Sequence, residues 1–308
     1  IDRGEKMIGI VIGGPTGVGK TSLSIKLAKI LDAVIINCDS MQIYKHMDIG
    51  TAKITEKEKE GVEHYMFDIV EPIDRYNVGD YYRDVNSLLK KFEKDNRNVI
   101  LVGGTGLYIN SIVRGLSKLP EADLNIRNSL EKLSTEELYE KLKELDEEAA
   151  KEIHPNNRVR VERAVEVCLL TGDKFSKLNK LNIKDNNYNF IQIALERDRK
   201  ILYDRIDYRV ELMIENGLVE EAKDIYEKYN SEKNKIKAIG YKELFDYFDG
   251  LISVDEAIEI IKKESRHYAK RQFTWFKGDA DYKWFDLGQI TEDEIIKKIL
   301  NFLNIFKS

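Results

Sequence analysis

The chain has 308 residues, 42% of them hydrophobic, so it can bury one large core or a core with a smaller appended domain. Its net charge of −5 gives no general attraction to nucleic acid, so any such function depends on a local basic patch. No apolar run is long enough to span a membrane and the N-terminus has no secretory signal pattern, so we expect a cytoplasmic protein. Cys38 and Cys168 lie in apolar runs, and we expect both in the core.

The first predicted elements follow an α/β pattern. Strand-like runs occupy residues 7–13, 33–37, 99–102 and 191–195, and helical segments such as 21–31 and 78–93 separate the first three. This alternation is typical of a parallel sheet covered by helices. Residues 1–6 show no periodicity, and we assign them no function.

Strand patterns stop between residue 114 and about residue 189, where helical spacing and a polar loop replace them. We therefore predict a helical insertion at 115–190, which separates a first part of the core at 7–114 from its completion at 191–308. After residue 195 we expect helices to the end of the chain. The amphipathic segments lie near 199–216, 218–229, 240–248, 254–277 and 292–306.

The first strand leads into "GPTGVGKT", Gly14 to Thr21, which fits the phosphate-loop (P-loop) pattern G-x-x-x-x-G-K-[ST] between a strand and a helix. In such a loop Lys20 reaches the terminal phosphates and the Thr21 hydroxyl binds Mg²⁺, while Gly17 and Gly19 let the backbone approach closely. The alternative is a glycine-rich turn that binds nothing. The predicted fold class is thus a P-loop α/β core with a helical insertion and a helical C-terminal part.

The acidic residue nearest to this loop follows the second strand, in "INCDSMQIY". Asp39 is expected at the carboxyl edge of the sheet, where open α/β sheets bind ligands. A carboxylate there can accept a proton from a nucleophile; it can equally be a helix cap, or a Mg²⁺ ligand in a small-molecule kinase. The strand "VILVGGTG" ends in Gly103 and Gly104 instead of an acidic Mg²⁺ ligand, which argues against an ordinary ATPase.

Basic residues at helical spacing occur in two places. In "YDRIDYRV", Arg205 and Arg209 are four residues apart and can clamp diphosphate oxygens, with Arg209 preferred, or can belong to a solvated face paired with Asp204 or Asp207. Two further stripes occur near the C-terminus, one made of Lys262, Arg266 and Lys270 and the other of Lys263, His267 and Arg271. We interpret these stripes as an RNA-binding face, with a solvated helix face as the alternative. The neighbouring aromatic residues, Tyr268, Phe273, Trp275 and Phe276, are expected mainly in the core.

Six strings in order and spacing resemble the bacterial tRNA dimethylallyltransferases, also called tRNA isopentenyltransferases. They are "GPTGVGKT", "DSMQIY" followed by "MDIGTAK", "GGTGLY", "HPNNRVRVERAVEV…TG", "IGYKEL" and "YAKRQFTWF". Together they cover the chain from Met7 to Phe276. The family transfers a dimethylallyl group from its diphosphate to the exocyclic N6 amine of the adenosine 3′ of the tRNA anticodon.

The resemblance implies that the phosphate loop holds the diphosphate of a prenyl donor, and it assigns roles to residues by motif. Asp39, Lys20 and Thr21 would be catalytic, with Asp39 taking the adenine proton and Thr21 binding Mg²⁺, the one expected cofactor. The expected diphosphate-binding residues are Gly14, Thr16, Gly17, Val18, Gly19, Lys20, Thr21 and Arg209. The expected tRNA-binding residues are Asp39, Ser40, Met41, Gln42, Thr105, Arg127, Val159, Arg160, Val161, Glu162 and Arg163, to which the basic stripe adds Arg266 and Lys270.

The expected partners are the tRNA anticodon stem-loop and dimethylallyl diphosphate, with no membrane, and the protein is expected to be a monomer. His64 receives no catalytic role, because relatives commonly show two adjacent histidines where this chain has Glu63 and His64. The alternative is a P-loop kinase for a small molecule or a nucleotide, which leaves the insertion and the basic stripes unexplained. An RNA-binding module without chemistry is a third hypothesis, which the complete phosphate loop and Asp39 disfavour.

Overall fold

The computed structural model describes residues 7–117, 119–183 and 188–307. The chain forms two compact units, one made of residues 1–113 and 186–308 and the other of residues 114–185. The predicted insertion at 115–190 overlaps the second unit but also includes Tyr188 to Phe190, which belong to the first.

The first unit is built on a parallel sheet that has six strands in the described part of the chain, in the order β3-β2-β4-β1-β7-β8. The strands are β1 Gly9–Gly13, β2 Ala33–Asn37, β3 His64–Tyr65, β4 Asn98–Gly103, β7 Phe190–Glu196 and β8 Lys283–Asp286. The four predicted strands are present, and β1 lies between β4 and β7. The expectation of helices alone after residue 195 is wrong, because β8 adds an edge strand to the sheet next to β7.

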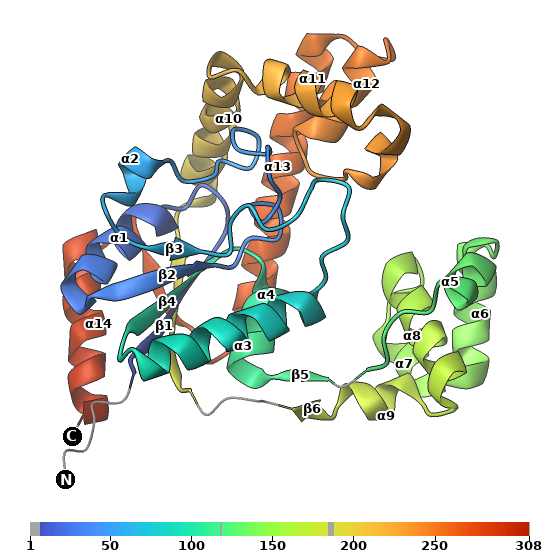
Figure 1. Ribbon diagram of the computed structural model, residues 1–308, viewed down its shortest axis with the longest axis horizontal. Helices are drawn as coiled ribbons and strands as arrows, with labels where there is room; N and C mark the ends of the chain where they lie inside the picture. The colour runs from blue at the N-terminus through green and yellow to red at the C-terminus, as the bar shows by residue number, and fades with distance from the viewer. Residues whose placement is uncertain (1–6, 118, 184–187, 308) are drawn as a thin grey trace. The chain divides into compact units, whose positions relative to one another are not determined.

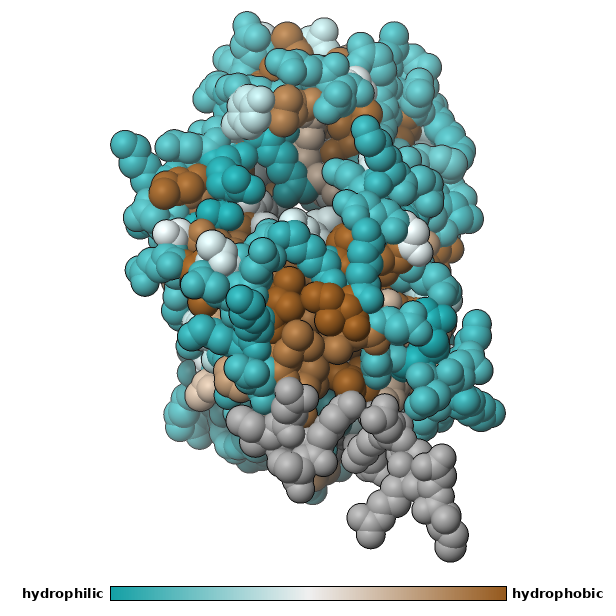
Figure 2. Space-filling model, turned by 90° about the vertical axis from the view of Figure 1, so that its left-hand side faces the viewer, coloured by the Kyte–Doolittle hydropathy of each residue, from teal (hydrophilic) through white to brown (hydrophobic). Residues whose placement is uncertain are grey.

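Helices cover both faces of this sheet (Figure 1). Alternate residues of β1 point to opposite faces: Ile10 packs with α1 and α14, and Val11 packs with α3 and α4. These helices are α1 Lys20–Leu31, α3 Val78–Lys94, α4 Gly106–Arg114 and α14 Glu292–Lys307. Figure 2 shows the side of the molecule that lies at the left in Figure 1, where hydrophilic side chains predominate around one apolar area in the lower half.

The remaining helices of this unit are α2 Glu56–Lys59, α10 Arg199–Glu215, α11 Leu218–Lys228, the 3₁₀ helix η1 Asn230–Lys235, α12 Tyr241–Phe248 and α13 Val254–Lys277. Helices α10 to α13 share a separate apolar cluster that includes Val210, Leu218 and Tyr241. Helix α13 also reaches the sheet, where Phe276 is fully buried with the strands. In the described residues no helix is both long enough and apolar enough to cross a membrane.

The second unit is helical. It contains α5 Leu124–Glu131, α6 Thr135–Leu145, α7 Glu147–Glu152, α8 Arg158–Thr171 and α9 Phe175–Asn179, with a short antiparallel pair of β5 Leu116–Ser117 and β6 Asn182–Ile183. As the sequence predicts, α8 ends at Gly172, whose N–H donates to the carbonyl of Cys168. The polar loop expected near the end of the insertion, residues 177–189, includes the end of α9 and all of β6, and its residues 184–187 lie outside the described residues. Both cysteines are buried and free, as predicted.

Candidate functional site

The P-loop lies where β1 ends and α1 begins. Gly19, at the N-cap of α1, has a φ of 117°, a conformation that glycine adopts without strain. The Lys20 ammonium donates to the carbonyls of Gly14 at 2.9 Å and Pro15 at 2.8 Å, so its side chain curls back over the loop. The Val18 side chain is fully buried, which leaves only its backbone for a ligand. Thr21 is exposed on the first turn of α1, beside the cavity described below.

Arginines from one segment of the chain surround this loop. Arg209 of α10 donates to the Thr16 hydroxyl at 3.0 Å, and Arg205 of the same helix donates to the Gly17 carbonyl at 3.0 Å. Arg197, directly after β7, donates to the Val18 carbonyl at 2.9 Å. The predicted spacing of Arg205 and Arg209 therefore brings both residues to the phosphate loop. Together with Lys20 they concentrate positive charge where an anion would bind.

Burial and the neighbouring charges shift the pKa of Lys20. Burial is the main cause that lowers the pKa of the Lys20 ammonium to about 8; the Asp39 charge opposes this shift and the Arg209 charge adds to it. Burial also lowers the pKa of Arg209, whose guanidinium stays protonated in any protein. The loop thus has permanent cations in its arginines, and in Lys20 it has a group whose protonated form a bound anion would favour.

Asp39 lies two residues after β2 and faces the same space. Its Oδ1 accepts the Met41 N–H at 2.8 Å, and its own N–H donates to the Asn37 side chain at 3.0 Å. The carboxylate therefore fixes the start of its own loop, while its charge also acts on Lys20 and Arg209. Burial, followed by the Asp39 charge, raises the pKa of the Tyr268 hydroxyl.

Two cavities meet at these residues. The larger, about 570 Å³, is lined by the phosphate loop and by Thr21, Arg205 and Gln272. The smaller, about 260 Å³, extends toward Met213, Tyr268 and Arg271. Four residues, Thr16, Asp39, Thr51 and Arg209, line both cavities. This geometry can hold an anion on the loop with its organic part near Asp39, and can admit a second molecule from the other cavity.

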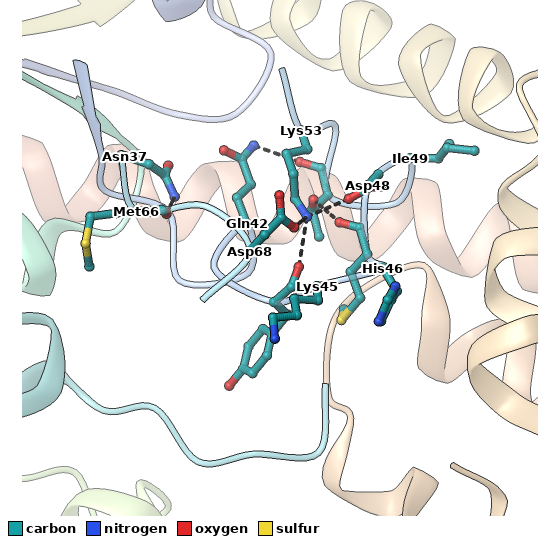
Figure 3. Close-up of polar contacts among 12 residues, drawn as sticks. Asn37, Gln42, Lys45, His46, Asp48, Ile49, Lys53, Met66 and Asp68 are labelled. Carbon is teal, nitrogen blue, oxygen red and sulfur yellow. Dashed lines mark hydrogen bonds and ion pairs between the residues drawn. The ribbon is translucent and has the colours of Figure 1, made fainter. Parts of the chain in front are cut away.

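The loop that follows Asp39 forms one wall of both cavities, and a buried lysine organises it (Figure 3). Lys53, whose side chain is only 7% exposed, donates to the Tyr44 carbonyl at 2.8 Å and to both Asp48 and Asp68 at 2.6 Å. Gln42 donates to the Thr51 carbonyl at 2.9 Å, across the same loop. These contacts hold "DSMQIYKHMDIGTAK" in a defined shape.

Hydrogen bonds connect the far end of this loop to α11. The Glu221 carboxylate accepts the N–H groups of Asp48 at 3.1 Å, Ile49 at 2.9 Å and Gly50 at 3.1 Å. The Tyr241 hydroxyl donates to the same carboxylate at 2.5 Å. Gly50 allows this arrangement, because a Cβ there would lie 2.6 Å from the Tyr241 ring. The strings "MDIGTAK" and "IGYKEL" thus meet in space.

Two predicted tRNA-binding residues of the first unit are hydrogen-bonded to each other. The Ser40 N–H donates to the Thr105 hydroxyl at 3.0 Å, and that hydroxyl lies 3.3 Å from the Ser40 hydroxyl. Met41 lines the smaller cavity and Gln42 the larger. The residues of "DSMQ" therefore line the cavities, and Thr105 is connected to them through Ser40.

The two basic stripes of α13 differ in their partners. In the first, Lys262 pairs with Glu211 and Glu259, and Arg266 pairs with Asp207 at 2.6 Å. These contacts attach α13 to α10, so two of the three charges are compensated within the protein. Among the described residues, Lys263, Lys270 and Arg271 have no ion-pair partner, and all three are exposed.

In the second unit, Glu166 is fully buried and accepts from Arg127 at 2.8 Å and Arg163 at 2.6 Å. Burial raises its pKa, but the hydrogen bonds from the two arginines outweigh this and hold it below its usual value. Both arginines therefore have a structural role. We expected Val161 to contact RNA, but its side chain is fully buried and cannot do so. Val159 is 81% exposed, and Arg160 is exposed. Glu162 is partly exposed.

Two residues that contact the phosphate loop were not predicted from the sequence. Gln272 of α13 accepts the Thr16 N–H at 2.8 Å, across 256 positions in sequence, and no local pattern could indicate this. Arg197 could have been found, because it follows a predicted strand at the edge where ligands bind. His64 donates its Nδ1–H to the Val62 carbonyl at 2.8 Å and lines the larger cavity.

A parallel sheet with a P-loop, an aspartate at the carboxyl edge and a second cavity defines a phosphate-binding α/β enzyme with room for two substrates. The sequence matches the IPP transferase family over residues 42–279, and the chain belongs to this family. The resemblance carried by the six strings is thereby confirmed.

Individual proteins agree with this assignment. A tRNA dimethylallyltransferase of Fusobacterium nucleatum is 56% identical over 96% of this chain and 97% of its own length. The one from Bacillus subtilis is 45% identical over 94% of each chain. Among solved structures, a tRNA isopentenylpyrophosphate transferase from Bacillus halodurans has a TM-score of 0.73 at 41% identity, covering 97% of this chain and 96% of its own. A eukaryotic dimethylallyltransferase acting on tRNA has a TM-score of 0.81 at 28% identity, and the match covers 97% of this chain and 80% of that one.

Proposed function

We propose that this protein transfers a dimethylallyl group from dimethylallyl diphosphate to the N6 amine of the adenosine next to the anticodon in tRNA, releasing diphosphate. The observation that carries the proposal is the junction of two cavities at Asp39, one lined by the phosphate loop with its cations and the other by residues of "DSMQ". The names of the relatives support the same reaction over the kinase alternative.

The chemistry of the site suits a leaving diphosphate. Lys20, Arg205 and Arg209 all contact the loop and can stabilise the negative charge that develops as the allylic carbon–oxygen bond breaks. The adenine amine is a weak nucleophile, so holding it in line with that carbon contributes more than removing its proton. In this proposal Asp39 accepts that proton, and a direct contact to Mg²⁺ is the other role open to it.

Mg²⁺ fits the donors that the site offers. The described residues contain no cluster of three His, Cys, Asp or Glu side chains that could enclose a metal ion. Mg²⁺ commonly needs only one or two protein oxygens and takes the rest from substrate phosphates and water. The exposed Thr21 hydroxyl can supply one oxygen, and the ion would help to neutralise the diphosphate.

The direct test incubates the protein with unmodified tRNA, Mg²⁺ and dimethylallyl diphosphate, and then analyses the tRNA nucleosides by mass spectrometry. We expect one adenosine per tRNA to gain a dimethylallyl group, with stoichiometric release of diphosphate. A parallel reaction with ATP addresses the kinase alternative. Phosphoryl transfer from ATP without prenylation of tRNA would refute the proposed function.

A further inference from the structure

The second basic stripe of α13, which contains His267 and Arg271, is exposed, and we call it the exposed stripe. One turn further along the same face lies a tryptophan that is not in the core. His267, Arg271 and Trp275 follow one another at intervals of four residues and so share one face of the helix. Trp275 is 46% exposed, although the sequence pattern places it with the buried aromatic residues, and Phe276 next to it is fully buried. Tryptophan is enriched at binding interfaces, because its ring offers a large apolar face together with an N–H donor.

The edge of this indole rests against the first turn of α4. A Cβ on Gly106 would lie 2.0 Å from the Trp275 indole nitrogen, so only glycine lets the ring lie there. The next residue, Leu107, is 48% exposed. Trp275 and Leu107 therefore provide apolar surface at the junction of α4 and α13, and we call these two residues with Arg271 the α4–α13 shelf.

The shelf adjoins the candidate site. Thr105, one residue before Gly106, is hydrogen-bonded to Ser40 of "DSMQ". Arg271, one turn before Trp275, lines the smaller cavity together with Asp39. A molecule whose reacting part enters that cavity would thus pass its neighbouring parts over or near the shelf.

We propose that the α4–α13 shelf stacks an unpaired nucleobase of the tRNA, one that neighbours the target adenosine. This inference rests on the proposed function and adds the residues that hold the RNA beside the reacting base. Stacking on an aromatic face, with arginine alongside, is how proteins hold bases of single-stranded RNA. The exposed charges of Lys270 and Arg271 match the RNA phosphates, whereas an apolar protein partner would leave them uncompensated.

The first experiment compares Trp275→Ala and Trp275→Phe for binding of an anticodon stem-loop. We expect the alanine variant to bind about tenfold or more weakly, as loss of one stacked base does, and the phenylalanine variant to recover most of the affinity. Leu251→Ala, which removes another exposed apolar side chain, should bind as the parent does. Affinity for dimethylallyl diphosphate should not change in any of them, which also shows that the fold is intact.

The two arginines of α13 provide a matched pair for the charge contribution. Arg271→Ala should reduce the salt dependence of stem-loop binding by about one unit of slope, because its charge is free to meet a phosphate. Arg266→Ala should reduce it less, because Asp207 already compensates that charge. Equal reductions, or a larger one for Arg266, would contradict the assignment of the RNA face to the exposed stripe.

A spectroscopic experiment reports on stacking itself. The chain has two tryptophans, so Trp284→Phe leaves Trp275 as the single indole. We expect the stem-loop to quench its fluorescence and an RNA duplex without a loop to leave it unquenched. If the parent prenylates tRNA but Trp275→Ala binds the stem-loop as tightly as the parent, the shelf proposal is wrong. If the parent neither binds nor prenylates tRNA, the proposed function fails first.

Discussion

The lowered pKa of Lys20 predicts that donor binding weakens in mildly alkaline solution. The shift from 10.5 to about 8 corresponds to about 3 kcal/mol against the charged form. Because the folded-state value is the depressed one, the ammonium is charged at pH 7 and loses its proton as the pH rises through about 8. A bound diphosphate favours the charged form, so binding above this pH takes up a proton.

The magnitude follows from this titration. At pH 9 only about one molecule in ten has a charged Lys20, so we expect the dissociation constant for dimethylallyl diphosphate to rise up to about tenfold from pH 7 to pH 9. Isothermal titration calorimetry in buffers of different ionisation enthalpy measures both the affinity and the proton uptake. Lys20→Arg, which stays charged, should bind with no such pH dependence. A flat profile for the parent, or an equal slope for Lys20→Arg, would refute the reasoning.

Three further predictions concern other parts of the structure. If Asp39 is the base, Asp39→Asn should lower the single-turnover rate about a hundredfold and leave the donor affinity unchanged. If Asp39 is a Mg²⁺ ligand, the donor affinity should fall and recover with excess Mg²⁺, and a near-parental rate would exclude both roles. Arg127→Ala should destabilise the protein by about 3 kcal/mol, because it leaves buried Glu166 with one guanidinium partner, and exposed Arg160→Ala should change the unfolding midpoint little. Tyr241→Phe removes a hydrogen bond to Glu221 and should cost about 1 kcal/mol in denaturant unfolding; an unchanged midpoint would contradict this.

Much of the fold could be predicted from the sequence, because hydrophobic periodicity marks long elements. The apolar run that becomes β2 and the 24-residue helix α13 were both found from such patterns. Strand β8 was missed, since four residues between two helices are too few for alternation to show and only pairing with β7 makes them a strand. Short edge strands are defined by their neighbours more than by their own residues.

The candidate site was predictable to the extent that its chemistry is local. The phosphate loop and Asp39 follow directly from strand ends and motif spacing, and Arg205 and Arg209 from helical spacing. Spacing could not reveal that Arg266 is paired with Asp207, because that acid lies 59 residues away on another helix. The exposure of Trp275 depends in the same way on packing against Gly106, which no periodicity describes.

The contact of Glu221 with the loop after Asp39 has a consequence for how the protein matures during synthesis. The Gly50 amide and its acceptor are 171 residues apart, so the loop can reach its final form only after the ribosome has released most of the chain. The phosphate loop emerges early, but the wall that would select an acceptor is completed late. Because Arg209 and Gln272, which contact the phosphate loop, are also made late, a nascent or C-terminally truncated chain would lack both a complete diphosphate site and a complete acceptor wall.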